Sequence, residues 1–130
     1  MLPKFRAWHK ELKIMDQVTE LDLCCQVVSA NAEEDFRWNL DEAILMQWTG
    51  FQDCDGRDIY EGDIVGYTST TFMVEPANIK VPIVFENGMF CAVYGGDHLQ
   101  ALQAVLKYGA PGDLKIIGNI YENPELLERK

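Results

Sequence analysis

One stretch of the sequence decides the fold: Leu45-Met-Gln-Trp-Thr-Gly-Phe-Gln-Asp-Cys-Asp-Gly-Arg-Asp-Ile-Tyr-Glu-Gly-Asp-Ile-Val65. Thr49-Gly50 interrupts its first apolar run. Asp55-Gly56 then predicts a tight hairpin turn, because glycine accepts the positive φ that such a turn needs. Glu61-Gly62-Asp63 predicts a second turn, and the strand Ile64–Tyr67 follows it. This spacing of turns indicates short antiparallel strands.

The segments before this stretch also favour strands. Residues 4–8 alternate polar and apolar side chains, as a half-buried strand does, and residues 12–15 return as a second strand. Residues 21–28 are rich in apolar and β-branched side chains and predict a third strand. Residues 29–39 are polar and predict an irregular excursion, whereas 41–46 fit either a short helix or the start of a strand.

The segments after this stretch contain a second hairpin signal. Asn87-Gly88 stands between the β-patterned runs 81–86 and 89–94, which predicts another tight turn. Pro76 and Pro82 argue against a central strand across either position, because proline cannot donate to a strand ladder.

Residues 97–108 change to a helical period. Leu99, Leu102 and Val105 fall on one helical face, which predicts a helix with Asp97 as its N-cap. Residues 114–121 predict a last strand with Gly118 at a bulge or close contact. The fold class is therefore α+β, mainly antiparallel β, with a small barrel and one helix near 97–108.

The length favours one domain over residues 1–130. An alternative division is an N-terminal β portion, 1–45, packed on a barrel portion, 46–130.

The composition excludes several classes of protein. Eleven Lys and Arg against twenty-one Asp and Glu give a net charge of −10, and 48% hydrophobic residues exclude a disordered chain. The sequence has no basic stripe, so nucleic acid is an unfavourable partner. It also has no long apolar run and no secretory signal pattern, so we expect a soluble, cytoplasmic protein that does not bind membranes.

The four cysteines, Cys24, Cys25, Cys54 and Cys91, lack the spacing of a metal site. Adjacent residues on a strand point to opposite faces, so Cys24 and Cys25 suit neither a chelate nor a mutual disulfide. We expect four free thiols, at least two of them buried, with no metal and no cofactor.

No catalytic set is evident. Asp53-Cys-Asp55-Gly56 fails as a calcium loop, because Phe51 and Gly62 would stand where carboxylates are required. A nucleophilic mechanism needs a histidine held beside a nucleophile, and sequence alone places neither His9 nor His98 in that way. The residues therefore predict that the protein is not an enzyme, and an enzyme would need a pocket joining a histidine to a cysteine or carboxylates.

Aromatic side chains gather in or beside the predicted strands, and core packing is the first interpretation. Trp and Tyr also anchor interfaces, which makes four of them candidate interface residues. These four are Trp8, Trp48, Tyr60 and Tyr121.

Four segments together resemble the YopX family, small proteins of phages and prophages in Gram-positive bacteria. They are Lys4–Trp8, Leu45–Val65, Ile83–Phe90 and Ile116–Leu127, and they occur in the family's order. Trp48 and Cys54-Asp55 depart from the common family residues without disturbing the expected strand and turn. The resemblance implies a mainly β fold with a small barrel of the Src-homology-3 type, and it supplies no established activity and no catalytic residues.

The leading functional hypothesis is a non-enzymatic phage or prophage accessory protein that acts through protein–protein interaction or self-assembly. We expect a homo-oligomer or an unknown phage or host protein as its partner, because open strand edges invite pairing. The alternatives are a nucleic-acid or nucleoprotein-binding small-barrel module and an enzyme with an unrecognised active site.

Overall fold

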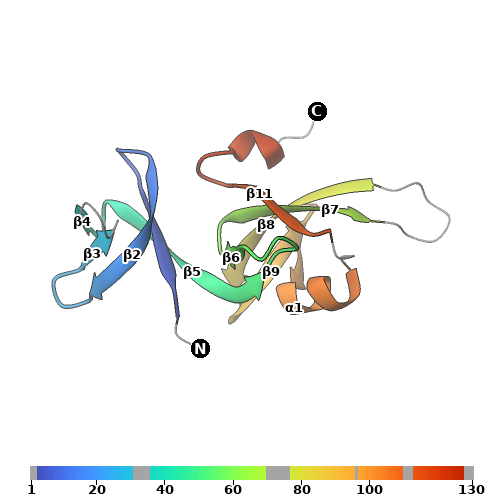
Figure 1. The fold of residues 1–130 in the computed structure, drawn as a ribbon, viewed down its shortest axis with the longest axis horizontal. Helices are drawn as coiled ribbons and strands as arrows, with labels where there is room; N and C mark the ends of the chain where they lie inside the picture. The colour runs from blue at the N-terminus through green and yellow to red at the C-terminus, as the bar shows by residue number, and fades with distance from the viewer. Residues whose placement is uncertain (1–2, 31–35, 70–76, 96, 110–112, 128–130) are drawn as a thin grey trace. The chain divides into compact units, whose positions relative to one another are not determined.

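The computed structural model describes residues 3–30, 36–69, 77–95, 97–109 and 113–127 (Figure 1). The chain divides into two compact units, Met1–Trp48 and Thr49–Lys130. Strands dominate both units, and eight pairs of neighbouring strands are antiparallel. A mainly antiparallel β fold is thus confirmed.

The first four strands of the first unit follow one another as antiparallel neighbours, and the fifth pairs with the first. They are β1 (Phe5–His9), β2 (Ile14–Asp22), β3 (Val27–Ala30), β4 (Phe36–Asn39) and β5 (Ala43–Gln52), the last of which runs on into the second unit. Together with β6 (Asp58–Tyr60) of the second unit, they form a six-stranded sheet in the order β4-β3-β2-β1-β5-β6. A small core forms where side chains of these strands meet, and its buried members are Ala7, Val28, Ala30, Trp38 and Ala43.

The single strand predicted over residues 21–28 is wrong. β2 ends at Asp22 and β3 begins at Val27, so a turn lies between them. The Asp22 carboxylate accepts hydrogen bonds from the backbone N–H groups of Cys24 at 3.0 Å and Cys25 at 3.1 Å. Aspartate commonly stabilises turns in this way. Gln26 completes the turn with φ 56°.

The irregular segment predicted over 29–39 is also wrong where the structure describes it. β3 continues to Ala30 and β4 spans Phe36–Asn39, while residues 31–35 lie outside the described residues. Trp38 explains the second strand, because its side chain is buried in the core. For residues 41–46 the strand alternative is correct, since β5 begins at Ala43.

The second unit contains the larger sheet. Its strands are β7 (Asp63–Ser69), β8 (Ala77–Glu86), β9 (Met89–Tyr94), β10 (His98–Ala101) and β11 (Lys115–Asn119), in the order β10-β9-β8-β7-β11. The short strand β6 (Asp58–Tyr60) pairs with β5 instead. No closed barrel is found in the described part of the chain, so the barrel stays a prediction.

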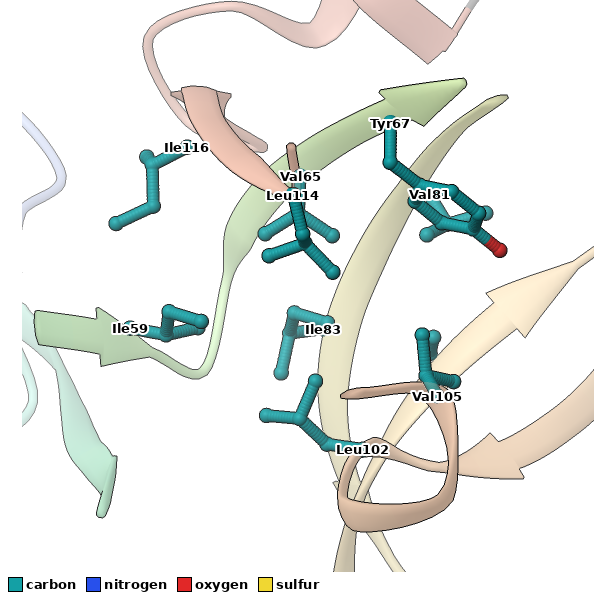
Figure 2. Packing of buried hydrophobic residues seen from close by; sticks show 10 residues of the cluster. Ile59, Val65, Tyr67, Val81, Ile83, Leu102, Val105, Leu114 and Ile116 are labelled. Carbon is teal, nitrogen blue, oxygen red and sulfur yellow. The ribbon is translucent and has the colours of Figure 1, made fainter. Parts of the chain in front are cut away.

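The core of this unit lies on one face of its sheet. Figure 2 shows apolar side chains of β7, β8 and β11 pointing toward the helical segment that carries Leu102 and Val105. Alternate residues of each strand reach this core, as the pleat requires. Its buried members are Ile59, Val65, Tyr67, Val81, Ile83, Ala92, Leu102, Val105, Leu114 and Ile116.

Both predicted hairpin turns are confirmed. Asn87 and Gly88 have φ of 54° and 78° and join β8 to β9, as a two-residue turn with two positive φ values does. Gly56, with φ 80°, lies in the turn between β5 and β6. Gly118 stands at a register shift between β7 and β11, so the predicted bulge is also present.

The helix predicted near 97–108 is partly wrong. Residues 98–101 form β10, in which Leu99 lies opposite Val93. Helical structure begins only at α1 (Leu102–Ala104) and continues as a π-helical turn, Val105–Gly109. Ala101, not Asp97, is the N-cap. Leu102 and Val105 keep the spacing of a helical face, but pairing with β9 decides the conformation of the preceding residues.

Pro82 lies in β8, a central strand, which contradicts the expectation that proline excludes one. The ladder between β8 and β9 begins only at Ile83, so Pro82 stands outside that ladder, and it lies opposite Ile64 in the ladder with β7. Pro76 lies outside the described residues. A last short 3-10 helix, η2, spans Pro124–Leu127.

Candidate functional site

Asp53 has a buried carboxylate side chain. Its carboxylate accepts backbone hydrogen bonds from Asp55 and Arg57, each at 2.9 Å, and from Ile116 at 3.0 Å. Burial by itself raises the pKa of Asp53, but these hydrogen bonds outweigh it and hold the pKa below its ordinary value. The carboxylate therefore fixes the Asp55-Gly56 turn to β11.

Asp63 plays a similar part in the next turn. Its buried carboxylate accepts a hydrogen bond from the Tyr60 N–H at 2.8 Å. Gly62, with φ 88°, donates its N–H to the carbonyl of Ile83 at 2.7 Å and accepts the N–H of Ile120 at 2.8 Å. The turn thereby joins three segments of the second unit.

Asn119 organises the chain after β11. Its side-chain oxygen accepts the N–H groups of Tyr121 at 3.0 Å and Glu122 at 2.8 Å, and its own N–H donates to Asn123 Oδ1 at 3.2 Å. A Cβ on Gly118 would lie 2.5 Å from Asn123 Oδ1, so this position needs glycine. The polar groups of this segment are thus used to shape the chain.

His9 is the residue that sequence reasoning could not place. It is buried, its Nδ1 accepts the Leu12 N–H at 3.1 Å, and its Nε2 lies 3.3 Å from Glu42 Oε2. The ring also meets the ring of Trp38 edge-on at 5.0 Å. A histidine does join a carboxylate here, as an enzyme would need, but both of its nitrogens are occupied. The arrangement closes the turn between β1 and β2 and leaves no nitrogen for a nucleophile or a metal.

The second histidine, His98, is exposed on β10. Its ring lies 6.5 Å from that of Tyr94, whose hydroxyl shares a hydrogen bond with the hydroxyl of Tyr67. Burial, followed by this hydrogen bond, raises the pKa of Tyr94, so the phenol stays neutral near pH 7. No cysteine or carboxylate contact to His98 is seen among the described residues.

All four cysteines are free. Cys24, Cys25 and Cys54 are exposed and only Cys91 is buried, so the expectation of at least two buried thiols is wrong. The reason is that the first three stand in turns rather than strands. Desolvation first, and nearby carboxylates next, raise the pKa of Cys54 and Cys91, which keeps these thiols protonated and weakly nucleophilic.

Metal-binding side chains are dispersed in the described part of the chain, where no group of three or more His, Cys, Asp or Glu lies close enough to hold an ion. Helices in the same residues are too short and too polar to cross a membrane.

The four candidate interface aromatics separate into two pairs. Trp8 and Tyr60 are buried, so their side chains pack inside the chain and are not presented to a partner. Trp48 and Tyr121 are half-buried, and the Lys4 ammonium lies 4.3 Å above the ring of Trp48. Burial of two of the four leaves core packing as the better interpretation.

The surface that sequence reasoning missed is the β10 edge. Residues 87–106 contain one charged side chain, Asp97, although the chain as a whole is one-quarter charged. This segment includes β9 and β10, and β10 is an end strand of its sheet. Ala101, Cys91 and Val84 form one uncharged cross-strand row that starts at this edge. A count of charges along the sequence would have found it.

The other sheet edges carry features that discourage pairing. β4 contains Arg37, and β6 is three residues long with Asp58 in it. β11 contains Lys115 and a register shift. Charges, short length and bulges are the usual protections of an edge strand. β10 is also short, with four residues, but it carries neither a charge nor a register shift.

Comparison with known proteins gives a consistent result. The sequence model of a family described as "YopX protein" matches residues 4–128. The crystal structure of protein EF1440 from Enterococcus faecalis is similar, with a TM-score of 0.71, 28% identity, and coverage of 98% of this chain and 99% of that one. The X-ray structure of yopX from Bacillus subtilis has a TM-score of 0.62 at 21% identity, covering 98% and 97%. Among curated proteins, none matches.

Proposed function

The chain belongs to the YopX family, and on that premise we propose that it is a non-enzymatic accessory protein of a phage or prophage that acts by binding protein. Its first partner is a second copy of itself, bound through the β10 edge. The observation that carries the proposal is the uncharged, unprotected strand His98–Ala101 at the end of the larger sheet.

Net charge supports the choice of this surface. Two copies that each carry a charge of −10 repel one another, so they associate where the contact surfaces add no further repulsion. β9 contains no Asp, Glu, Lys or Arg, and the polar residues of β10 are His98 and Gln100. Screening over about 8 Å at physiological salt weakens the repulsion between the remaining charges.

Strand pairing supplies the attraction. Two β10 strands related by a two-fold axis pair antiparallel, and each satisfies the backbone groups on the open edge of the other. The half-buried side chains of Leu99 and Ala101 then meet apolar neighbours across the new strand pair. The larger sheet becomes one continuous sheet shared by two copies.

The buried polar side chains described above support a non-enzymatic role. Asp53, Asp63 and Asn119 are buried and hold backbone N–H groups, and His9 has both nitrogens occupied. None of these four residues lines the groove beside Pro3–Phe5 and Gln17–Leu21 or the groove beside Gly66.

The test is the mass of the full chain in solution, measured by size exclusion with light scattering from low to high micromolar concentration. We expect a mass above the 14.8 kDa of one chain, and a shift toward one chain in Gln100→Lys. Two facing lysines repel at the shared edge, although each substitution makes the net charge of the chain less negative by one.

Gln26→Lys is the matched control, because Gln26 is exposed in a turn of the first unit. Its φ is 56°, and a lysine already adopts φ 55° at Lys13, in another turn of that unit. This variant should associate as the natural chain does. A single-chain mass throughout the range would overturn self-association. An oligomer unaffected by Gln100→Lys would overturn the role of β10.

A further inference from the structure

A second surface of the larger sheet carries a different arrangement of side chains. Gly66 of β7 lies opposite Lys80 of β8 on one side and opposite Lys115 of β11 on the other. The three residues therefore form one cross-strand row, Lys80–Gly66–Lys115, on the sheet face opposite the core. A groove of about 290 Å³ runs along this row, and Ile117 and Asp113 complete its walls.

The backbone does not require glycine at position 66. Its φ is not in the left-handed region, and a Cβ built on it would lie 3.4 Å from Ile117 Cγ2 and 3.5 Å from Ile117 Cδ1, at the close limit of ordinary contact. Glycine inside a strand costs stability, and it often marks a place where a ligand approaches the backbone closely. At Gly66 the floor of the groove is backbone between two lysines, with the Ile117 side chain packed beside it.

The charges of the groove determine what it can hold. Lys80 is exposed and makes no ion pair with another described residue. Lys115 lies 3.4 Å from Asp55, and both side chains are about half-exposed, so this pair is weak. The Asp113 carboxylate is held by the Thr68 N–H at 3.1 Å at one end of the groove. The formal charges of these two lysines and two carboxylates cancel, so the groove disfavours a polyanion, and the two lysines beside the glycine floor offer contacts to a single negative charge.

The apolar wall narrows the ligand class further. Ile117 is 38% exposed beside the glycine floor, and apolar contact there adds to the attraction of the lysines. Two strand spacings, about 10 Å, separate the lysine backbones, and their long side chains can converge above Gly66.

From this geometry we propose that the Lys80–Gly66–Lys115 groove binds a monocarboxylate with a short apolar body, either a free molecule or an acidic side chain of a peptide. The site is distinct from the β10 edge and does not depend on self-association. Both lysines donate to the carboxylate, and the apolar body lies against Ile117.

The test is a titration of the full chain with carboxylate probes. The amide signals of Gly66 and its neighbours are monitored in a nitrogen–proton correlation spectrum. Butyrate and N-acetylglutamate amide are the two carboxylate probes, and they distinguish a free molecule from a peptide side chain. We expect saturable shifts centred on Gly66 and Lys115 with at least one of them. Neutral butyramide should give none at the same concentration.

Three variants sharpen the result. Lys80→Gln should weaken binding about threefold, as loss of one exposed charge contact does. Gly66→Ala should weaken it by filling the floor. Lys13→Gln, an equal charge change in the first unit, should leave it unchanged. Absence of saturable shifts, a response to inorganic phosphate alone, or binding insensitive to Lys80→Gln would each overturn the proposal.

Discussion

The carboxylate of Asp53 accepts a hydrogen bond from the backbone N–H of Ile116, 63 residues further along the chain, at 3.0 Å. Two further N–H groups, from Asp55 and Arg57, donate to the same side chain. One buried carboxylate thus fixes both a local turn and the attachment of β11.

Replacing this carboxylate should strongly destabilise the protein. Asp53→Ala leaves the N–H of Ile116 buried without its acceptor, and we expect a loss of about 2–4 kcal/mol in the free energy of unfolding. Urea unfolding followed by tryptophan fluorescence measures it. Asp55→Asn is the control, because it removes only the exposed ion pair with Lys115 and should cost less than about 1 kcal/mol. Equal losses in the two variants would contradict the role given to Asp53.

Stability should also depend on pH through Asp53. Its pKa is lower in the folded chain than in the unfolded chain, because three N–H groups hold its charged form. Its contribution is therefore present above the unfolded pKa, about 3.9, and is lost as pH falls through the folded pKa. Urea unfolding between pH 7 and pH 3 should show stability falling at the acid end. Asp53→Asn should fall less steeply over that range, and parallel curves would count against this account.

The hairpins were the part of the fold that sequence could predict. Asn87-Gly88 and Asp55-Gly56 act through their own backbone preferences, so two residues suffice to place each turn. The 97–108 helix failed because Leu99 satisfies a helical spacing and also pairs with Val93. Such a choice depends on a partner strand, which periodicity does not reveal.

In the candidate site, too, only the features that depend on local chemistry could be predicted. Glycine at 56 and 62 could be assigned to turns from local chemistry. Nothing local indicated that Asp53 would meet Ile116, or that His9 would lie beside Glu42. The lysine row across Gly66 also depends on strand register, which a single sequence does not specify.

The exposure of each cysteine thiol can be tested directly by its reactivity. Cys24, Cys25 and Cys54 are exposed, whereas Cys91 is 2% exposed. Titration with a thiol reagent should modify three groups in the native protein and the fourth only after unfolding. Cys91→Ala should abolish the reaction that requires unfolding and leave the other three. Modification of all four thiols in the native protein would contradict the burial of Cys91.

Gly118 and Asn123 should be strongly coupled. A Cβ at position 118 would lie 2.5 Å from Asn123 Oδ1, too close for the two atoms to coexist. Gly118→Ala should therefore cost about 1–3 kcal/mol of unfolding free energy through overpacking. Asn123→Ala by itself should cost about 1 kcal/mol, because the Asn119 N–H loses its acceptor. In the double variant Gly118→Ala/Asn123→Ala the two nearest colliding atoms, Oδ1 and Cγ of residue 123, are gone and only its Cβ, at 2.9 Å, stays close, so its loss should be smaller than the sum of the two single losses. Urea unfolding of the natural chain, the two single variants and the double variant gives this coupling energy.

Gly56→Ala is the matched control for replacing a glycine, since Gly56 has φ 80° and no atom lies within 4 Å of the added Cβ. It should cost about 1–2 kcal/mol by backbone strain alone, and Asn123→Ala should not relieve that cost. Strict additivity of Gly118→Ala and Asn123→Ala would show that the two side chains do not meet.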